Sequence, residues 1–314
     1  MLEVILRRVI SIIPVLFGVS LITFGLIHII PGDPAIVIAG PDASADQVQS
    51  IRELLELDRP LHIQMGAWYM NLFQGDLGNS FMLGRSVVQA VQERLPTTLL
   101  LTTYSIIISM PIGIAAGLLA AYRQNTWVDT TVMTVALLGV SVPSFWLSIM
   151  GILVFSVALG WLPSSGYVPP SEGIIACLRS LTLPAISLAV LQIGLLARMT
   201  RATTLEVLRQ DFIRTARAKG VSEWKTVGRH ALSNVMIPIV TVVGLLVNIA
   251  IAGAVVIEQI FVLPGVGQLV VQGILRRDYP VIQGSILAVA VLLVLINLVV
   301  DLLYAYLDPR LRND

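Results

Sequence analysis

Six long runs of apolar residues constrain this chain more than any other feature of its sequence. They cover about 9–30, 97–121, 131–159, 181–197, 235–257 and 281–305. A helix needs ~20 mostly apolar residues to cross a bilayer, whereas a barrel strand needs about half as many. Of the 314 residues, 56% are hydrophobic and only 12% are charged. The sequence therefore predicts an all-α integral membrane protein with six transmembrane helices.

Two of these runs have features that affect their expected geometry. The third contains Pro143, which cannot donate a backbone hydrogen bond and should kink or break the helix. The fourth run, 181–197, is short for a span. Cys177, the only cysteine, is expected in the short outer loop between these two runs.

The distribution of basic residues predicts the orientation of the spans. Short cytoplasmic loops of membrane proteins are enriched in Lys and Arg. If the N-terminus is inside, most of the twenty Lys and Arg lie on the inner side once the long 31–96 loop is discounted. Both termini are therefore expected in the cytoplasm.

The chain is expected to have two parts. Residues 1–96 would form the first transmembrane helix, an uncleaved anchor, and a structured extracytoplasmic loop. Residues 97–314 would form a five-helix core with a cytoplasmic loop at 198–233. Within the first part, "SADQ" at Ser44–Gln47 predicts a capping box that opens a helix. A second helix would carry Trp68 and Tyr69, either packed on the membrane domain or available for docking.

Several functions are excluded or disfavoured by composition. A net charge of +1 argues against a nucleic-acid partner. No Gly-Lys pair is present, so the chain has no Walker A loop for ATP. His28, His62 and His230 are far apart, and with one cysteine they make no recognisable metal site. We expect no catalytic residue, no metal and no cofactor on this chain. The remaining classes are a transporter subunit powered by a partner, a secondary carrier or channel, and a passive scaffold.

The fifth run carries a small and polar stripe. Its members follow one another at steps of three or four residues, so they share one face of a helix: Thr241, Gly244, Asn248 and Ala252. Such a stripe either lines a passage or packs against another helix. The sequence leaves both alternatives open.

The loop 198–233 is too polar to span and too patterned to be a tether. Its apolar spacing around Leu205, Leu208 and Phe212 favours a helix that leads into "RTARAKG". Gly220 can end this helix in a left-handed conformation, and Ser222 can cap a second helix. An ordinary positive-inside loop is the alternative. The candidate contact with a partner comprises Arg214, Thr215, Ala216, Arg217, Ala218, Lys219 and Gly220.

"RTARAKG" followed by "ALSNVMIP" resembles the cytoplasmic EAA loop of permease subunits of ATP-binding-cassette importers. The match is to the dipeptide, oligopeptide, glutathione and nickel importer group. Ala216, Gly220 and Leu232 fit the wider pattern, whereas four positions depart from it: Arg214, Thr215, His230 and Ser233. The resemblance covers nearly the whole chain and includes "PGDP" at 31–34, "GDLG" at 75–78, "LPG-G" at 263–267, "RRDYP" at 276–280 and "NLVVDLLY" at 297–304.

This resemblance implies a type I ABC importer permease fold in the bacterial inner membrane. It also implies partners: a second, homologous permease, two ATPase subunits or domains and an extracytoplasmic substrate-binding protein. ATP and Mg would bind to the ATPases, and residues 214–220 would couple ATPase closure to the membrane domain. The expected substrates are di- and oligopeptides, with glutathione or a nickel or other metal chelate as alternatives.

Overall fold

The computed structural model describes residues 2–29, 34–40, 43–54, 57–222, 225–226 and 232–307. Their regular structure is helical apart from one isolated β-bridge between Asn79 and Ser86. The elements are α1 (Leu2–Ile29), α2 (Pro34–Ala39), α3 (Ala45–Leu54), α4 (Leu61–Phe73), α5 (Val87–Tyr122), α6 (Trp127–Ser141), α7 (Ser144–Gly151), the π-helix η1 (Ile152–Ala158), the 3₁₀-helix η2 (Pro170–Glu172), α8 (Ile174–Val207), α9 (Asp211–Ala218), α11 (Leu232–Ile260), α12 (Val266–Arg276) and α13 (Tyr279–Leu307).

The prediction of an all-helical membrane protein is confirmed. Among the described residues, parts of α5, α8, α11 and α13 are each long and apolar enough to cross a membrane. The bent pair formed by α6 and α7–η1 can supply a fifth span. A shorter apolar stretch, Ile10–Gly25, lies in α1. The count of six spans stays a prediction.

The predicted break at Pro143 is confirmed. Helix α6 ends at Ser141, and Val142 and Pro143 are extended. Proline disfavours a helical conformation in the residue before it, which accounts for the extended Val142. The helices on the two sides of the break differ in direction by 98°.

The chain divides into two compact units. The first comprises Met1–Ile5, Thr97–Leu263 and Leu295–Asp314, and the second comprises Leu6–Pro96 and Pro264–Val294. The predicted organisation into 1–96 and 97–314 stays a prediction.

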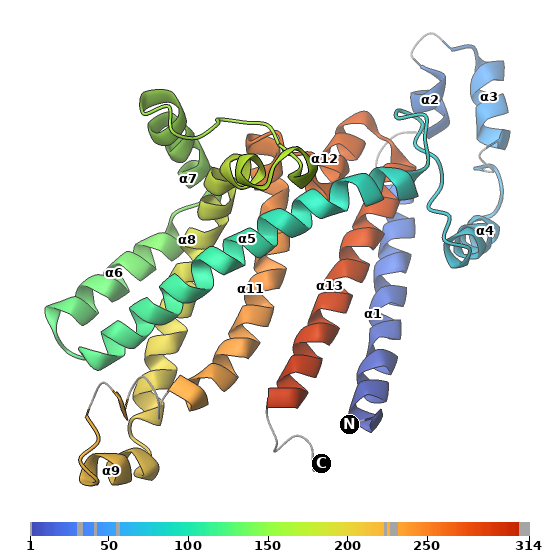
Figure 1. The fold of residues 1–314 in the computed structure, drawn as a ribbon. Helices are drawn as coiled ribbons and strands as arrows, with labels where there is room; N and C mark the ends of the chain where they lie inside the picture. The colour runs from blue at the N-terminus through green and yellow to red at the C-terminus, as the bar shows by residue number, and fades with distance from the viewer. Residues whose placement is uncertain are drawn as a thin grey trace. The chain divides into compact units, whose positions relative to one another are not determined.

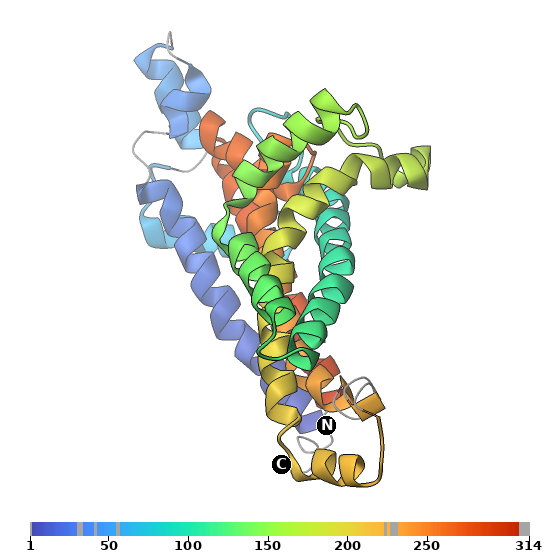
Figure 2. The same cartoon turned by 90° about the vertical axis from the view of Figure 1, so that its left-hand side faces the viewer.

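Helix α8 is the centre of the first unit, with α5, α6 and α11 around it (Figures 1 and 2). Glycines bring the helices together. A Cβ on Gly117 would lie 2.5 Å from the carbonyl oxygen of Ala197 in α8, and one on Gly194 would lie 2.4 Å from that of Ala136 in α6. Small residues permit such close approach between membrane helices, where packing replaces the hydrophobic effect as the main attraction.

The α5–α8 contact also contains a buried polar group. Gln192 of α8 accepts a hydrogen bond from the Ser109 hydroxyl at 2.6 Å and donates one to the Ser105 hydroxyl at 3.0 Å. All three side chains are at most 1% exposed. Ser105, Ser109, Gly113 and Gly117 recur at every fourth position, so they form one continuous small face on α5.

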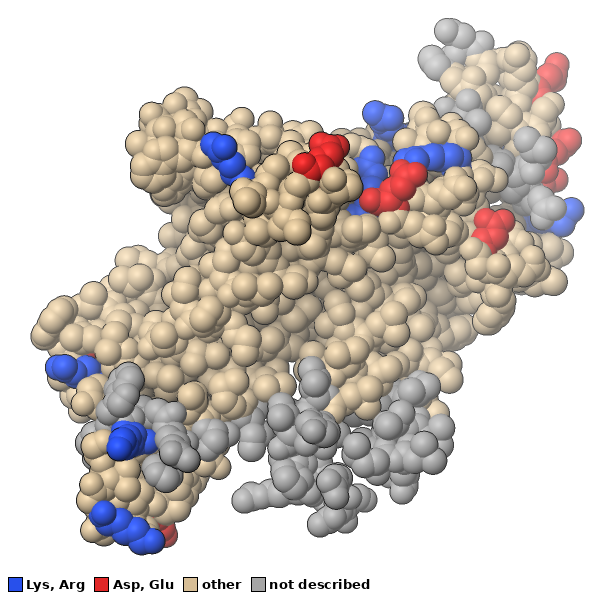
Figure 3. Space-filling model, viewed as in Figure 1, with Lys and Arg blue, Asp and Glu red and all other residues tan. Residues whose placement is uncertain are grey.

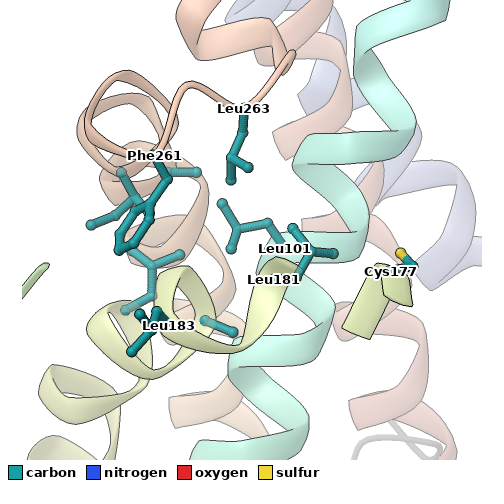
Figure 4. Packing of buried hydrophobic residues seen from close by; sticks show 10 residues of the cluster. Leu101, Cys177, Leu181, Leu183, Phe261 and Leu263 are labelled. Carbon is teal, nitrogen blue, oxygen red and sulfur yellow. The ribbon is translucent and has the colours of Figure 1, made fainter. Parts of the chain in front are cut away.

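A buried apolar cluster fills the end of this unit near the start of α8. Leu101, Leu181, Phe261 and Leu263 belong to it, as does Cys177 (Figure 4). The expectation that Cys177 lies in a loop is wrong, because α8 begins at Ile174 and this thiol is 4% exposed. The apolar run at 181–197 marks only the middle of a longer helix.

The second unit confirms the capping box. The Ser44 amide donates to Oε1 of Gln47 at 2.9 Å, and the Gln47 amide donates to Oγ of Ser44 at 3.3 Å. The two hydrogen bonds open α3 as predicted. The predicted helix with Trp68 and Tyr69 is α4, and the Tyr69 hydroxyl lies 2.7 Å from the Ser20 hydroxyl of α1.

The end of α12, also in the second unit, is fixed by a buried carboxylate. Asp278 is 2% exposed. Its Oδ2 accepts hydrogen bonds from the Ser80 hydroxyl at 2.6 Å and from the Met82 amide at 3.1 Å. The residue before it, Arg277, has a left-handed backbone with φ of 54°.

Candidate functional site

The segment that contains "RTARAKG" begins with a break at the end of α8. Helix α8 continues to Val207, well past its apolar part, and a tight turn at 208–210 follows. Gln210 is extended, and α9 starts at Asp211 in a new direction. The sequence favoured a helix through this region without placing the interruption.

Helix α9 has one buried and one exposed face. Ile213 is fully buried in a cluster with Val207 of α8 and Val235 of α11. Ala216, one turn further along the same face, is also buried. The side chains that point away are exposed: Arg214, Thr215, Arg217, Ala218 and Lys219. Of the candidate contact residues, Ala216 therefore faces the chain itself.

Gly220 ends α9 as predicted. Its φ is +78°, in the left-handed region. The Gly220 amide donates to the carbonyl of Arg217 at 2.9 Å, and the Val221 amide donates to that of Ala216 at 3.2 Å. These two bonds define a Schellman motif. The predicted second helix falls largely on residues 223–224 and 227–231, which lie outside the described residues.

A hollow of about 530 Å³ opens beside α9 within the first unit. Three segments contribute to it: the end of α5 with the turn that follows, the end of α8, and Arg217 of α9. The lining residues are Ala121, Tyr122, Arg123, Gln124, Leu205, Leu208, Arg209 and Arg217. Figure 3 shows basic side chains over α9 and the turn between α5 and α6.

One basic residue of this region is neutralised inside the fold. Arg201 of α8 makes two hydrogen bonds to Asp129 in the first turn of α6, at 2.6 and 2.7 Å. The Asn125 amide also donates to Asp129 at 3.1 Å. The pair fixes the start of α6 to α8. Sequence reasoning missed it; the isolated acid at the edge of an apolar run was the available signal.

The stripe on α11 is divided between packing and exposure. A Cβ on Gly244 would lie 2.6 Å from Cγ1 of Val300 in α13, and the Asn248 amide group donates to Oδ1 of Asn297 at 2.9 Å. Both residues therefore pack on α13. Thr241 and Ala252, at the two ends of the stripe, are exposed.

A further polar residue lies just beyond the predicted end of the fifth run. Glu258 belongs to α11 and is fully buried, and its Oε1 accepts a hydrogen bond from the Thr98 hydroxyl at 2.6 Å. Sequence reasoning did not single out this acid, because its partner is distant in the chain.

Comparisons with known proteins agree over the whole chain. A model of the binding-protein-dependent transport system inner membrane component family matches residues 113–313, and a model of the N-terminal part of such components matches residues 1–102. A Brucella abortus chain provisionally named a peptide transport system permease protein is 53% identical, with all of both chains covered.

Two further relatives carry more specific names. The dipeptide transport system permease protein of Alkalihalophilus pseudofirmus is 41% identical, with 99% of this chain and 100% of the relative covered. The glutathione transport system permease protein of Escherichia coli strain K12 is 43% identical, with 99% of each chain covered.

Solved structures of the MetNI methionine ABC transporter in inward-facing conformations have a similar fold. One has a TM-score of 0.57 at 18% identity and covers 70% of this chain and 97% of that one. Another has a TM-score of 0.54 at 20% identity and covers 71% and 96%. The fold is that of an ABC importer permease.

Proposed function

We propose that this chain, which belongs to the family of binding-protein-dependent transport system inner membrane components, forms half of the pathway through which an ATP-driven importer moves peptides. Residues 214–220, in α9 and the turn that ends it, would be the element on which a cytoplasmic ATPase acts. In this proposal the ATPases bind ATP and Mg, and a second, homologous permease completes the pathway. An extracytoplasmic binding protein delivers the substrate.

The observation that carries the coupling assignment is the two-sided character of α9. Ile213 belongs to a buried cluster with residues of α8 and α11, and Ala216 is buried on the same face, while the opposite face is basic and exposed. A force applied to the exposed face is therefore passed to two long helices through packed side chains. Lys219 would orient the ATPase by charge, and the turn at Gly220 keeps the end of the helix compact.

This assignment is tested by placing one substitution on different faces. Ala218→Glu adds bulk and negative charge to the exposed face. The ATPase surface that meets this basic face would be acidic, and a like charge placed against it in a packed interface costs a few kcal/mol. We therefore expect at least about tenfold weaker co-purification with the ATPase. Ala202→Glu, at an exposed position on α8 outside the segment, is the matched control. Ala216→Glu should instead loosen α9 from the chain and uncouple hydrolysis from uptake. If Ala218→Glu assembles and transports like the parent, residues 214–220 form only a positive-inside loop.

The peptide assignment rests on the relatives at 41–53% identity. Glutathione is the second candidate because the relative named for it is 43% identical, and it is itself a tripeptide. Calorimetry on the cognate binding protein with dipeptides, oligopeptides, glutathione and a nickel chelate would order these substrates. Uptake of the nickel chelate alone by reconstituted vesicles would rule out the peptide assignment.

The separate subunits of the assembly are expected to be inactive. The chain alone in liposomes should neither hydrolyse ATP nor concentrate substrate, and uptake driven by an ion gradient would favour a secondary carrier.

For the proposed orientation, with six spans and both termini inside, Ser222→Cys should react with an impermeant maleimide only from the cytoplasmic side. Thr241 and Ala252 are the stripe positions that we propose line the pathway.

A further inference from the structure

We propose that the hollow beside α9 binds the phosphate-bearing headgroup of an anionic phospholipid of the cytoplasmic leaflet. The positive charge of the hollow's lining is the first observation. The described lining contains Arg123, Arg209 and Arg217 and no acidic residue. Basic pockets between the ends of transmembrane helices attract anionic headgroups, and each Lys or Arg near the surface strengthens this attraction.

The depth of the hollow is the second observation. Tyr122 ends α5 and Trp127 starts α6, and their side chains are 40% and 77% exposed. Exposed Tyr and Trp at the ends of apolar helices mark the headgroup level of a bilayer. Arg123 and Gln124, which line the hollow, lie in the turn between these two aromatic residues. A phosphate at this level belongs to the lipid layer itself.

The mixed character of the lining is the third observation. Leu205 and Leu208 form an apolar wall beside the arginines, and both are partly buried. A free phosphate would leave this wall in water. A phospholipid would place its phosphate against the guanidinium groups and the start of its acyl chains against the leucines. Arg123 also lies over the Tyr122 ring, with Cζ 5.8 Å from the ring centroid, which holds one guanidinium at the rim.

Such a lipid would connect two elements of the first unit. Arg217 belongs to α9, whereas Arg123 follows α5. A single headgroup between them would restrain α9 without a direct protein contact. This consequence rests on the proposed coupling role of α9, but binding of the lipid does not.

The test counts lipids on the purified full-length chain by native mass spectrometry. Dioleoyl phosphatidylglycerol and dioleoyl phosphatidylcholine are titrated separately, and we expect one tightly held phosphatidylglycerol with no equivalent for phosphatidylcholine. The double variant Arg123→Gln/Arg209→Gln should bind phosphatidylglycerol roughly thirtyfold more weakly, as expected for the loss of two surface arginines. Arg276→Gln/Arg277→Gln makes the same change of charge at the end of α12 and should bind like the parent.

Other sources of the signal give different results. If glycerol 3-phosphate displaces the lipid at the concentration at which the lipid itself binds, the ligand is a small soluble phosphate and the proposal is wrong. It is also wrong if the ATPase subunits expel the lipid on assembly, since the hollow would then be a protein contact. Equal weakening in both double variants would show a general effect of charge and would overturn the site. A photoreactive phosphatidylglycerol offers a check on the parent chain and should label residues 121–124 or 205–209.

Discussion

Helices α9 and α12 end in the same hydrogen-bonding pattern but place different residues at its left-handed position. In α9, Gly220 and Val221 donate to the carbonyls of Arg217 and Ala216. In α12, Arg277 and Asp278 donate to the carbonyls of Ile274 and Gly273 in the same way, at 3.2 and 2.9 Å. The left-handed residue is glycine in the first and arginine in the second, with φ of 78° and 54°.

The surroundings of each left-handed residue explain the difference. A left-handed residue with a Cβ costs about 1–2 kcal/mol. At Arg277 this cost is offset, because the next residue is a buried aspartate bonded to Ser80 and Met82. At Gly220 a Cβ would meet no atom of the described residues within 4 Å, so none of them packs where a side chain would stand. Glycine is therefore found where the cap depends on local conformation, and another residue where a distant anchor enforces it.

Removing the Asp278 carboxylate, which anchors the end of α12, should have the largest effect on stability. Asp278→Ala removes the acceptor of the buried Ser80 hydroxyl and of the part-buried Met82 amide, and we expect a loss of about 3 kcal/mol in unfolding free energy. Thermal unfolding of the detergent-purified chain measures it. Asp278→Asn keeps a carbonyl acceptor and should lose less. A parent-like melting temperature for Asp278→Ala would mean that the left-handed arginine is held by something else.

Gly220→Val should have an intermediate effect on the other helix end. A β-branched residue at φ of 78° should cost about 2 kcal/mol and unravel the last turn of α9. Hydrogen exchange of the peptide 211–221 should then accelerate, with little change in global melting. Gly220→Asn is the control, since asparagine tolerates this conformation better. Unchanged exchange in the valine variant would contradict the importance of the left-handed turn.

Arg277→Gly should change stability least, and it should raise stability where the other two substitutions lower it. Relief of the left-handed arginine should stabilise the chain by about 1 kcal/mol, partly cancelled by the greater freedom of glycine in the unfolded chain. The melting temperature should therefore rise slightly or stay level. A clear fall would show that the Arg277 side chain stabilises the fold through its own contacts.

The same contrast explains which features the sequence could predict. The cap at Gly220, the break at Pro143 and the capping box at Ser44–Gln47 depend on neighbours within a few residues, and all three were predictable. The Arg201–Asp129 pair, the buried Glu258 and the anchor beside Arg277 each depend on a partner at least 72 residues away, so none of them has a local signal. The buried face of α9 was missed for the same reason, because Ile213 joins Val207 and Val235 in one cluster only after the chain has turned at 208–210.

The burial of Cys177 makes this chain well suited to spectroscopic study of its working cycle. A thiol that is 4% exposed reacts slowly with maleimide and methanethiosulfonate reagents, and it is the only one in the sequence. A cysteine introduced at an exposed position can therefore be given a spin label or a fluorophore without first removing the native residue. Pairs of such labels on α9 and at the far end of α8 would report how their separation changes during ATP turnover.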